Sequence, residues 1–145
     1  MDNNKLMNYV ESIRHFNRIY AQVMNILDPY SVHPVYTNTE MRMLYEIKSM
    51  HQPTANTLVK NWRVDPGYVS RVLAKFVRDK LITKQELLQD KRTKVLILTE
   101  KGEECVQKII HKANSNIIEG LQGLKENDFE DLVDAMKRIQ EYITW

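Results

Sequence analysis

The sequence has few of the features that mark exported, membrane or disulfide-bonded proteins. Its 145 residues include one cysteine, Cys105, so no internal disulfide can form. The longest uninterrupted apolar run is Val95 to Leu98, whereas roughly 20 apolar residues are needed to span a bilayer. The N-terminal stretch MDNNKLMNYVES lacks the apolar segment of an export signal. These absences predict a cytoplasmic protein with no membrane partner.

Residues that carry catalysis or bind metals are also sparse. We find no catalytic triad, Gly-rich phosphate loop, H-x-x-x-H or C-x-x-C spacing. The sequence therefore predicts no enzyme, no metal and no cofactor. Cys105 and His111 could gather with a carboxylate as a metal site, and Cys105 alone could sense oxidants. Its apolar neighbours favour a buried structural thiol instead.

Charge is unevenly distributed along the chain. The net charge is only +2, but residues 60–101 contain eleven Lys/Arg and five Asp/Glu. This segment therefore carries +6, and the remainder of the chain carries −4. A basic middle between acidic ends is typical of a module that binds a polyanion.

Periodicity and capping signals predict a mainly helical chain with one small β-hairpin, an α+β fold. An apolar stripe predicts a helix over residues 5–27, ended by Pro29. Thr37 and Glu40 form a capping-box pattern that opens a helix ending before Pro53. A short helix over 54–61 and a turn lead to Asp65-Pro66, an N-cap followed by proline.

The second half continues with a helix from 66 to about 79 and a hairpin. Runs 81–88 and 94–98 are predicted strands. Thr99 caps the next helix, and a last helix carries apolar residues from 129 to 143. Helices flanking a helix-turn-helix and a hairpin wing predict a single winged helix-turn-helix domain, with the DNA-binding lobe at about 37–101.

The helix over 66–79 has the two faces expected of a recognition helix. The predicted inward stripe is Val69, Val72, Leu73, Phe76 and Val77. The opposite face is small or polar near its start, so it can approach DNA base edges closely. The predicted DNA contacts on this helix are Pro66, Gly67, Tyr68, Ser70, Arg71 and Lys75, with Arg71 reading a guanine and Lys75 a phosphate. An ordinary solvated surface helix is the alternative.

The predicted hairpin tip strengthens the DNA-binding hypothesis. Lys91, Arg92 and Lys94 place three cations within four positions, and a cationic tip can enter the minor groove. Asp90 lies two residues before Arg92, close enough to orient its guanidinium by a bidentate pair. We therefore predict a wing over 88–94 that contacts the minor groove through these three cations.

These motifs resemble the MarR family of bacterial transcriptional regulators. Residues Thr37 to Leu44 are similar to the family's LT-x-x-Q-F-R-V-L helix, and Asp90-Lys91-Arg92 followed by Leu96 to Gly102 is similar to its D-x-R … L-T-x-x-G wing. Further matching pieces are Leu58, Tyr68 to Leu73 and Leu81-Ile82. Lys80 replaces the glycine usual before L-I, and a left-handed lysine there is tolerable.

The resemblance implies a homodimer, most often a repressor that a small ligand releases from a palindromic operator of double-stranded DNA. The dimer would form through residues about 1–30 and 102–145. A terminal helix pair that packs within one monomer is the alternative. The predicted dimerisation residues are Leu6, Val10, Ile13, Phe16, Tyr20, Leu132, Met136, Ile139 and Ile143.

A ligand pocket is implied between the dimer helices and the DNA-binding lobe. His15, Tyr20, Tyr36 and Arg42 are candidate anchors for a small aromatic or acidic effector, although packing or surface roles explain each equally well. The alternative function is a family-shaped dimer that titrates another regulator without reading DNA. The basic segment and the Asp90/Arg92 pair argue against that alternative.

Overall fold

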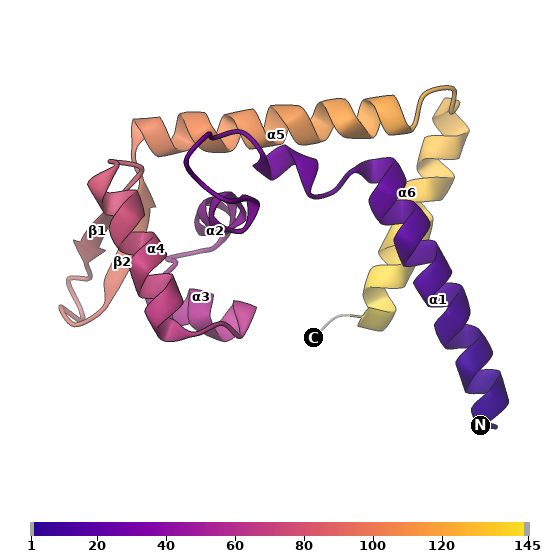
Figure 1. The fold of residues 1–145 in the computed structure, drawn as a ribbon, viewed down its shortest axis with the longest axis horizontal. Coiled ribbons are helices and arrows are strands. Elements are labelled where there is room, and N and C mark those ends of the chain that lie inside the picture. Colours follow the sequence, from indigo (N-terminus) through magenta and orange to yellow (C-terminus); the bar gives the residue numbers. More distant parts are fainter. Residues whose placement is uncertain (1, 144–145) are drawn as a thin grey trace.

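The computed structural model describes residues 2–143 of the chain. The long helix α5 (Glu100–Gly120) connects two separate parts of the molecule (Figure 1). At one end lies the lobe, made of α2 (Asn38–Ser49), α3 (Ala55–Trp62), α4 (Pro66–Arg78), β1 (Ile82–Glu86) and β2 (Lys94–Leu98). At the other end lies the arm, made of α1 (Asn3–Met24) and α6 (Glu126–Ile143). A short 3-10 helix, η1 (Asp28–Tyr30), lies in the connection from arm to lobe.

The lobe helices begin where the capping residues predict. Thr37 and Glu40 form the predicted capping box, in which each side chain accepts from the other residue's backbone N–H at 3.2 and 2.8 Å. The Asp65 carboxylate accepts from the Tyr68 N–H at 2.9 Å, ahead of Pro66 at the first helical position. Thr99 accepts from the Gly102 N–H at 3.1 Å. These local bonds satisfy donors that every helix start leaves free.

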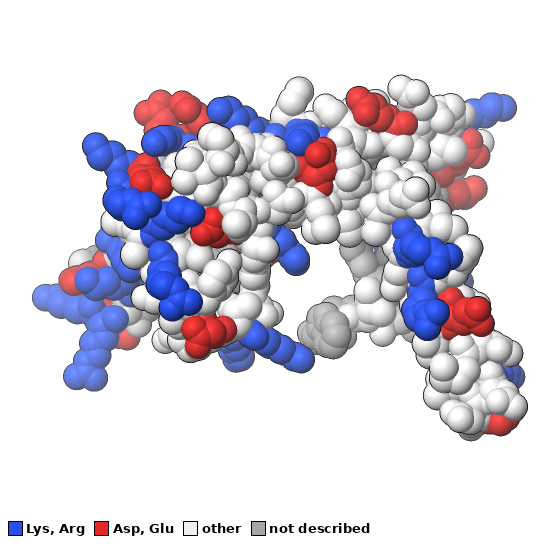
Figure 2. Space-filling model, in the orientation of Figure 1, with Lys and Arg blue, Asp and Glu red and all other residues white. Residues whose placement is uncertain are grey.

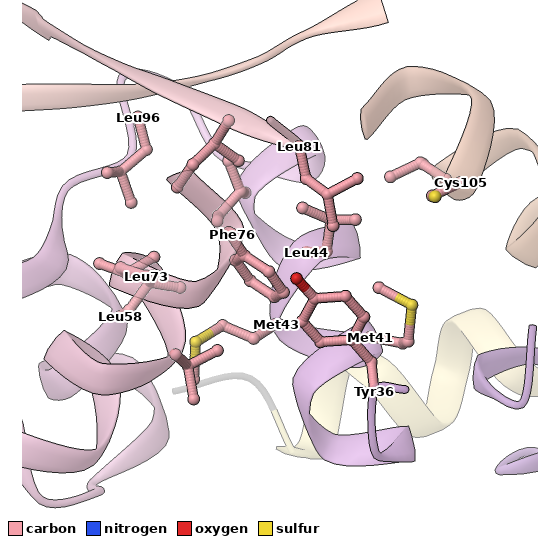
Figure 3. Close-up of a cluster of buried hydrophobic side chains, with 14 of the residues drawn as sticks. Tyr36, Met41, Met43, Leu44, Leu58, Leu73, Phe76, Leu81, Leu96 and Cys105 are labelled. Carbon is pink, nitrogen blue, oxygen red and sulfur yellow. The ribbon is translucent and has the colours of Figure 1, made fainter. Parts of the chain in front are cut away.

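The hydrophobic core lies inside the lobe and under the first half of α5. Phe76 of α4 is fully buried among side chains from α2, α3, β1 and β2 (Figure 3). Cys105 of α5 borders this core and is 8% exposed. The fully buried large side chains are Phe76, Met41, Met43, Leu44, Leu58, Leu73, Leu81, Ile82, Ile109, Val69 and Val106. These contacts fix α4 against the rest of the lobe.

The wing is an antiparallel hairpin whose register pairs Ile82 with Leu98 and Glu86 with Lys94. Its first strand is shorter than the predicted run 81–88. The Leu81 N–H bonds to the Phe76 carbonyl and closes the end of α4 instead. At the other end, the ladder gives way to a turn over residues 87–93. The Leu96 N–H bonds to the Pro53 carbonyl at 2.8 Å and ties β2 to the lobe.

The junction between α4 and the wing depends on Lys80 and Gly102. Lys80 adopts the predicted left-handed conformation, with φ of 59°, which is uncommon for a residue other than glycine. Gly102 lies against the Leu81 backbone so closely that a Cβ atom would overlap the Leu81 carbonyl oxygen. Packing therefore requires glycine at position 102. At position 80, lysine can replace the glycine that is usual in the resembled family.

The arm helices are hardly buried in the single chain. Helix α1 ends at Met24, earlier than the prediction, because Asn25 takes a left-handed conformation with φ of 47°. Met24 is its one buried residue among those described, and α6 buries no described side chain. Residues 1, 144 and 145, which belong to the predicted dimerisation segments, lie outside the described range.

Candidate nucleic-acid interface

Helix α4 presents a free face at the outside of the lobe. Val69, Val72, Leu73 and Phe76 are buried as predicted, which turns the opposite side toward solvent. Val77 is an exception, because it is 41% exposed. The prediction that it packs inward was wrong, since position 77 lies about a quarter turn from the centre of the buried stripe. It borders a shallow depression with Lys80, Ile82 and Lys84 at the wing base.

The first two turns of α4 are open to a ligand. Pro66, Ser70 and Arg71 are exposed, and Gly67 and Tyr68 are half-buried. A Cβ atom on Gly67 would lie 2.8 Å from Asp65 Oδ2 and 3.4 Å from an Arg71 guanidinium nitrogen. The absence of a side chain at Gly67 therefore leaves room for Arg71 along the start of the helix. The structure brings Pro66, Gly67, Ser70 and Arg71 together at this open face, whereas Tyr68 packs partly against the lobe core.

Lys75, the sixth predicted contact, has its ammonium group engaged by the protein. Lys75 Nζ lies 3.1 and 3.2 Å from the two carboxylate oxygens of Glu40, and these side chains are 25% and 12% exposed. The ammonium also lies 4.3 Å from the Tyr36 ring centroid. Sequence reasoning missed this pair because Glu40 and Lys75 are 35 positions apart. A phosphate contact by Lys75 would require this ion pair to break.

Tyr36 makes a second contact between the loop before α2 and the end of α4. Its hydroxyl donates to the Asp79 carboxylate, and it also bonds the Lys75 carbonyl oxygen at 3.3 Å. Burial, with the bond to Asp79, raises the pKa of Tyr36. The Tyr36 hydroxyl and then the Arg78 guanidinium lower the pKa of Asp79. Because Tyr36 and Asp79 therefore keep a neutral donor and an ionised acceptor at neutral pH, the last turn of α4 is held in place.

The wing turn is built on Asp90, though not by the contact predicted. The carboxylate accepts from the Thr93 hydroxyl at 2.8 Å and the Arg92 backbone N–H at 3.0 Å. These bonds, led by the Thr93 hydroxyl, lower the pKa of Asp90. Within residues 2–143 no ion pair joins Asp90 to the Arg92 guanidinium, so the predicted bidentate pair was wrong. Asp90 shapes the turn and leaves the Arg92 side chain free to reach outward.

Basic side chains gather over the outer end of the lobe (Figure 2). Lys91 and Arg92 are exposed at the wing tip, and Lys94 lies at 3.8 Å from Glu86 in a solvent-exposed pair. Such an exposed pair is weak and leaves the lysine available. The wing cations and the open face of α4 thus belong to one end of the molecule.

The predicted dimerisation residues lie on α1 and α6, whose described side chains stay largely exposed. Leu6, Val10, Ile13 and Phe16 are exposed on α1, as are Ile139 and Ile143 on α6. Tyr20, Leu132 and Met136 are half-buried. Exposed apolar surface of this extent on two helices is characteristic of an interaction surface.

A cavity of about 380 Å³ lies where α1, η1, α2 and α5 meet. Tyr20 lines it, together with Tyr30, Tyr45 and Asn114, which sequence reasoning missed. The rest of its lining is Met24, Ile26, Pro29, Ile109, Ile110, Ala113 and Ile117. Burial raises the pKa of Tyr30, so its hydroxyl keeps its proton at neutral pH.

The other three residues predicted for a ligand pocket lie elsewhere. His15 pairs with Arg18 at 3.0 Å on α1, and Tyr36 belongs to the lobe core. The Arg42 guanidinium stacks 5.0 Å from the Trp62 ring centroid. Their aromatic or charged character was the only sequence signal, and it does not tell a packed side chain from a cavity wall.

The residues considered for redox or metal chemistry do not form a site within residues 2–143. Burial raises the pKa of the Cys105 thiol, opposite to the shift that a reactive thiol needs. Over residues 2–143, no group of three or more His, Cys, Asp or Glu side chains could hold a metal ion. No helix in the same range is long and apolar enough to cross a membrane.

The fold and its outer face define a winged helix-turn-helix protein, a class that binds DNA through a recognition helix and a hairpin. Residues 36–94 match the model of the MarR family. This match covers most of the lobe, and the proteins of the MarR family are transcription regulators rather than enzymes.

Individual relatives agree with this assignment. The chain is 28% identical over 82 residues to the HTH-type transcriptional regulator BilQ of Clostridium symbiosum, covering 54% of this chain and 57% of BilQ. It is 24% identical to the uncharacterised HTH-type transcriptional regulator SAV2265 of Staphylococcus aureus, covering 92% of each chain. Its fold is similar to that of a putative MarR family regulator from Listeria monocytogenes, solved with a 26mer DNA. There the TM-score is 0.61 at 24% identity, over 92% of this chain and 87% of the other.

Proposed function

We propose that this regulator acts as a cytoplasmic homodimer that binds a palindromic operator of double-stranded DNA. The observation that carries the proposal is the open first half of α4 beside a cationic wing. Tyr68, Ser70 and Arg71 would reach base edges in the major groove, while Lys91, Arg92 and Lys94 would enter the minor groove. The operator would span roughly 16–20 base pairs, with half-sites about one helical turn apart.

The dimer is supported by the apolar surface of the arm. Exposed leucine, isoleucine, valine and aromatic side chains on α1 and α6 would bury one another in a second copy of the chain. Two copies related by a twofold axis would present two α4 helices to the two halves of a palindrome.

Regulation by a small ligand is supported by the cavity at the junction of arm and lobe. Its walls are mostly apolar, and three tyrosines and Asn114 can orient a ligand. A small aromatic or acidic effector fits this lining, and the DNA-bound regulator would repress. The effector can release DNA only by binding more tightly to a dimer whose α4 spacing does not fit the operator.

The decisive experiment measures binding of the purified protein to the DNA upstream of its own coding region, across a salt series. We expect binding that weakens steeply with salt and prefers this DNA over a scrambled duplex by roughly a thousandfold or more. Weak and equal binding to both duplexes would favour a dimer that titrates another regulator.

A further inference from the structure

The wing carries one apolar side chain that the fold does not use. Leu88 is 101% exposed, the highest value among the large hydrophobic side chains of residues 2–143. Its neighbour Leu87 is half-buried. A leucine with no contact in its own fold contributes nothing to stability through burial, so its side chain is available to contact a ligand.

Leu88 is held outward by an ordered turn. The Leu87 N–H bonds to the Thr93 carbonyl at 3.3 Å, and the Leu87 carbonyl accepts from the Asp90 N–H at 3.3 Å. The Asp90 carboxylate fixes the far side of the turn through Arg92 and Thr93. These bonds close the chain on both sides of Leu88, and its side chain is exposed to solvent.

The surroundings of Leu88 are cationic. Lys91 and Arg92 are exposed in the same turn, and Lys94 follows it. Ile97, the nearest other exposed large hydrophobic side chain in the hairpin, lies on β2 at the opposite end of the register. A single leucine is too small to serve as a protein interface by itself. A DNA groove suits the combination better, because its phosphate edges attract cations and its deoxyribose walls are apolar.

We propose that Leu88 is a DNA-contact residue that packs against the deoxyribose wall of the minor groove when the wing binds. Proteins that enter the minor groove frequently place apolar side chains there beside basic ones. This inference rests on the proposed DNA binding and adds to it a contact that releases no counterion. Leu88 would therefore strengthen binding equally at low and high salt, whereas Arg92 would act mainly at low salt.

The test uses the full-length protein and a duplex of the DNA upstream of its own coding region, titrated across a salt series. We expect Leu88→Ala to weaken binding roughly tenfold at every salt concentration, with an unchanged slope of log affinity against log salt. Leu88→Met should retain most of the affinity, while the polar Leu88→Asn should lose as much as the alanine variant. Arg92→Ala should instead flatten the slope.

Two controls separate this contact from other effects. Gln89→Ala shortens the exposed neighbour of Leu88 and should leave affinity unchanged. Because Leu88 makes no contact in the fold, its variants should keep the thermal unfolding midpoint of the parent protein. Equal affinity of Leu88→Ala and the parent would overturn the inference, as would a change in salt slope. If the parent itself does not distinguish the upstream duplex from a scrambled one, the proposed function fails instead.

Discussion

The lobe and the arm use apolar residues in opposite ways. Phe76 in the lobe is fully buried by residues of the same chain, whereas Phe16 in the arm is 50% exposed. Both regions are helical, and both carry clear apolar stripes in the sequence. The difference shows that an apolar stripe predicts a buried face but does not say whether one chain supplies everything needed to bury it.

The two regions also differ in their polar contacts. The lobe is tied by bonds between distant segments, such as Lys75 with Glu40 and Tyr36 with Asp79. In the arm, local bonds join Arg18 with His15 and Lys137 with Asp134. The lobe is therefore specified by its own chain, and we expect the arm to gain its specificity from a second copy.

The largest expected effect comes from opening the lobe core. Phe76→Ala should lower the free energy of unfolding by about 3–5 kcal/mol, because it leaves a cavity among fully buried side chains. Urea denaturation measures this loss, and the smaller truncation Phe76→Leu should cost less. The dimer dissociation constant, measured by sedimentation on the protein that remains folded, should stay unchanged. A large shift in that constant would contradict the separation of lobe and arm.

The matching substitution in the arm should act on assembly. Phe16→Ala is expected to weaken the dimer by about 2 kcal/mol, since a central aromatic side chain would be lost from the interface. Sedimentation over a range of protein concentrations measures the shift. Gln22→Ala, on the polar side of the same helix, should leave the dimer intact. A monomeric parent protein would refute the proposed role of the arm.

Within the lobe, Arg71→Ala and Lys75→Ala should separate DNA contact from internal support. Arg71→Ala should cost about 1–3 kcal/mol of operator binding and relax specificity at one position. Lys75→Ala should mainly lower stability, because it leaves the largely buried Glu40 carboxylate without its cation. Competition binding and thermal unfolding measure the two effects. An equal loss on scrambled DNA would restrict Arg71 to phosphate contact. A flatter salt slope for Lys75→Ala would show that Lys75 leaves Glu40 to reach a phosphate.

A smaller effect, dependent on pH, is expected at Tyr36. Tyr36→Phe removes the hydroxyl that lowers the pKa of Asp79 from its ordinary value of 3.8. A carboxyl with a lowered pKa stabilises the folded state above its ordinary pKa, and this contribution is lost as pH falls through the lowered value. The stability difference between parent and variant should therefore be largest near neutral pH and shrink below 3.8.

Urea denaturation from neutral pH down to about pH 3 measures this difference. Tyr45→Phe is a suitable control, since among residues 2–143 no hydrogen bond joins the Tyr45 hydroxyl to a carboxylate. A difference for Tyr36→Phe that does not change with pH would assign its effect to packing rather than to Asp79.

Features fixed by neighbouring residues could be predicted from the sequence. The caps at Thr37, Asp65 and Thr99 and the left-handed Lys80 depend on a few adjacent positions, and the structure confirms all four. The order of helices and wing followed from these signals together with the apolar periodicity.

Features that depend on distant residues could not be predicted in this way. The Glu40–Lys75 and Tyr36–Asp79 contacts join positions 35 and 43 apart, so no local pattern marks them. The exposure of Val77 depends on how far α4 is rotated against the core. The cavity wall likewise combines residues from four elements, of which only Tyr20 was anticipated.

Contacts to other segments hold α4 at its last turn, so the two halves of the helix differ in which residues can be substituted. Lys75 and Asp79 secure the C-terminal end, and the buried stripe sets the rotation of the helix. Ser70, Arg71 and Ala74 are exposed on the opposite side of the helix and take no part in these contacts. These three positions can therefore be replaced without disturbing the packing of α4. A library randomised at these positions should yield regulators with new operator preferences and an unchanged scaffold.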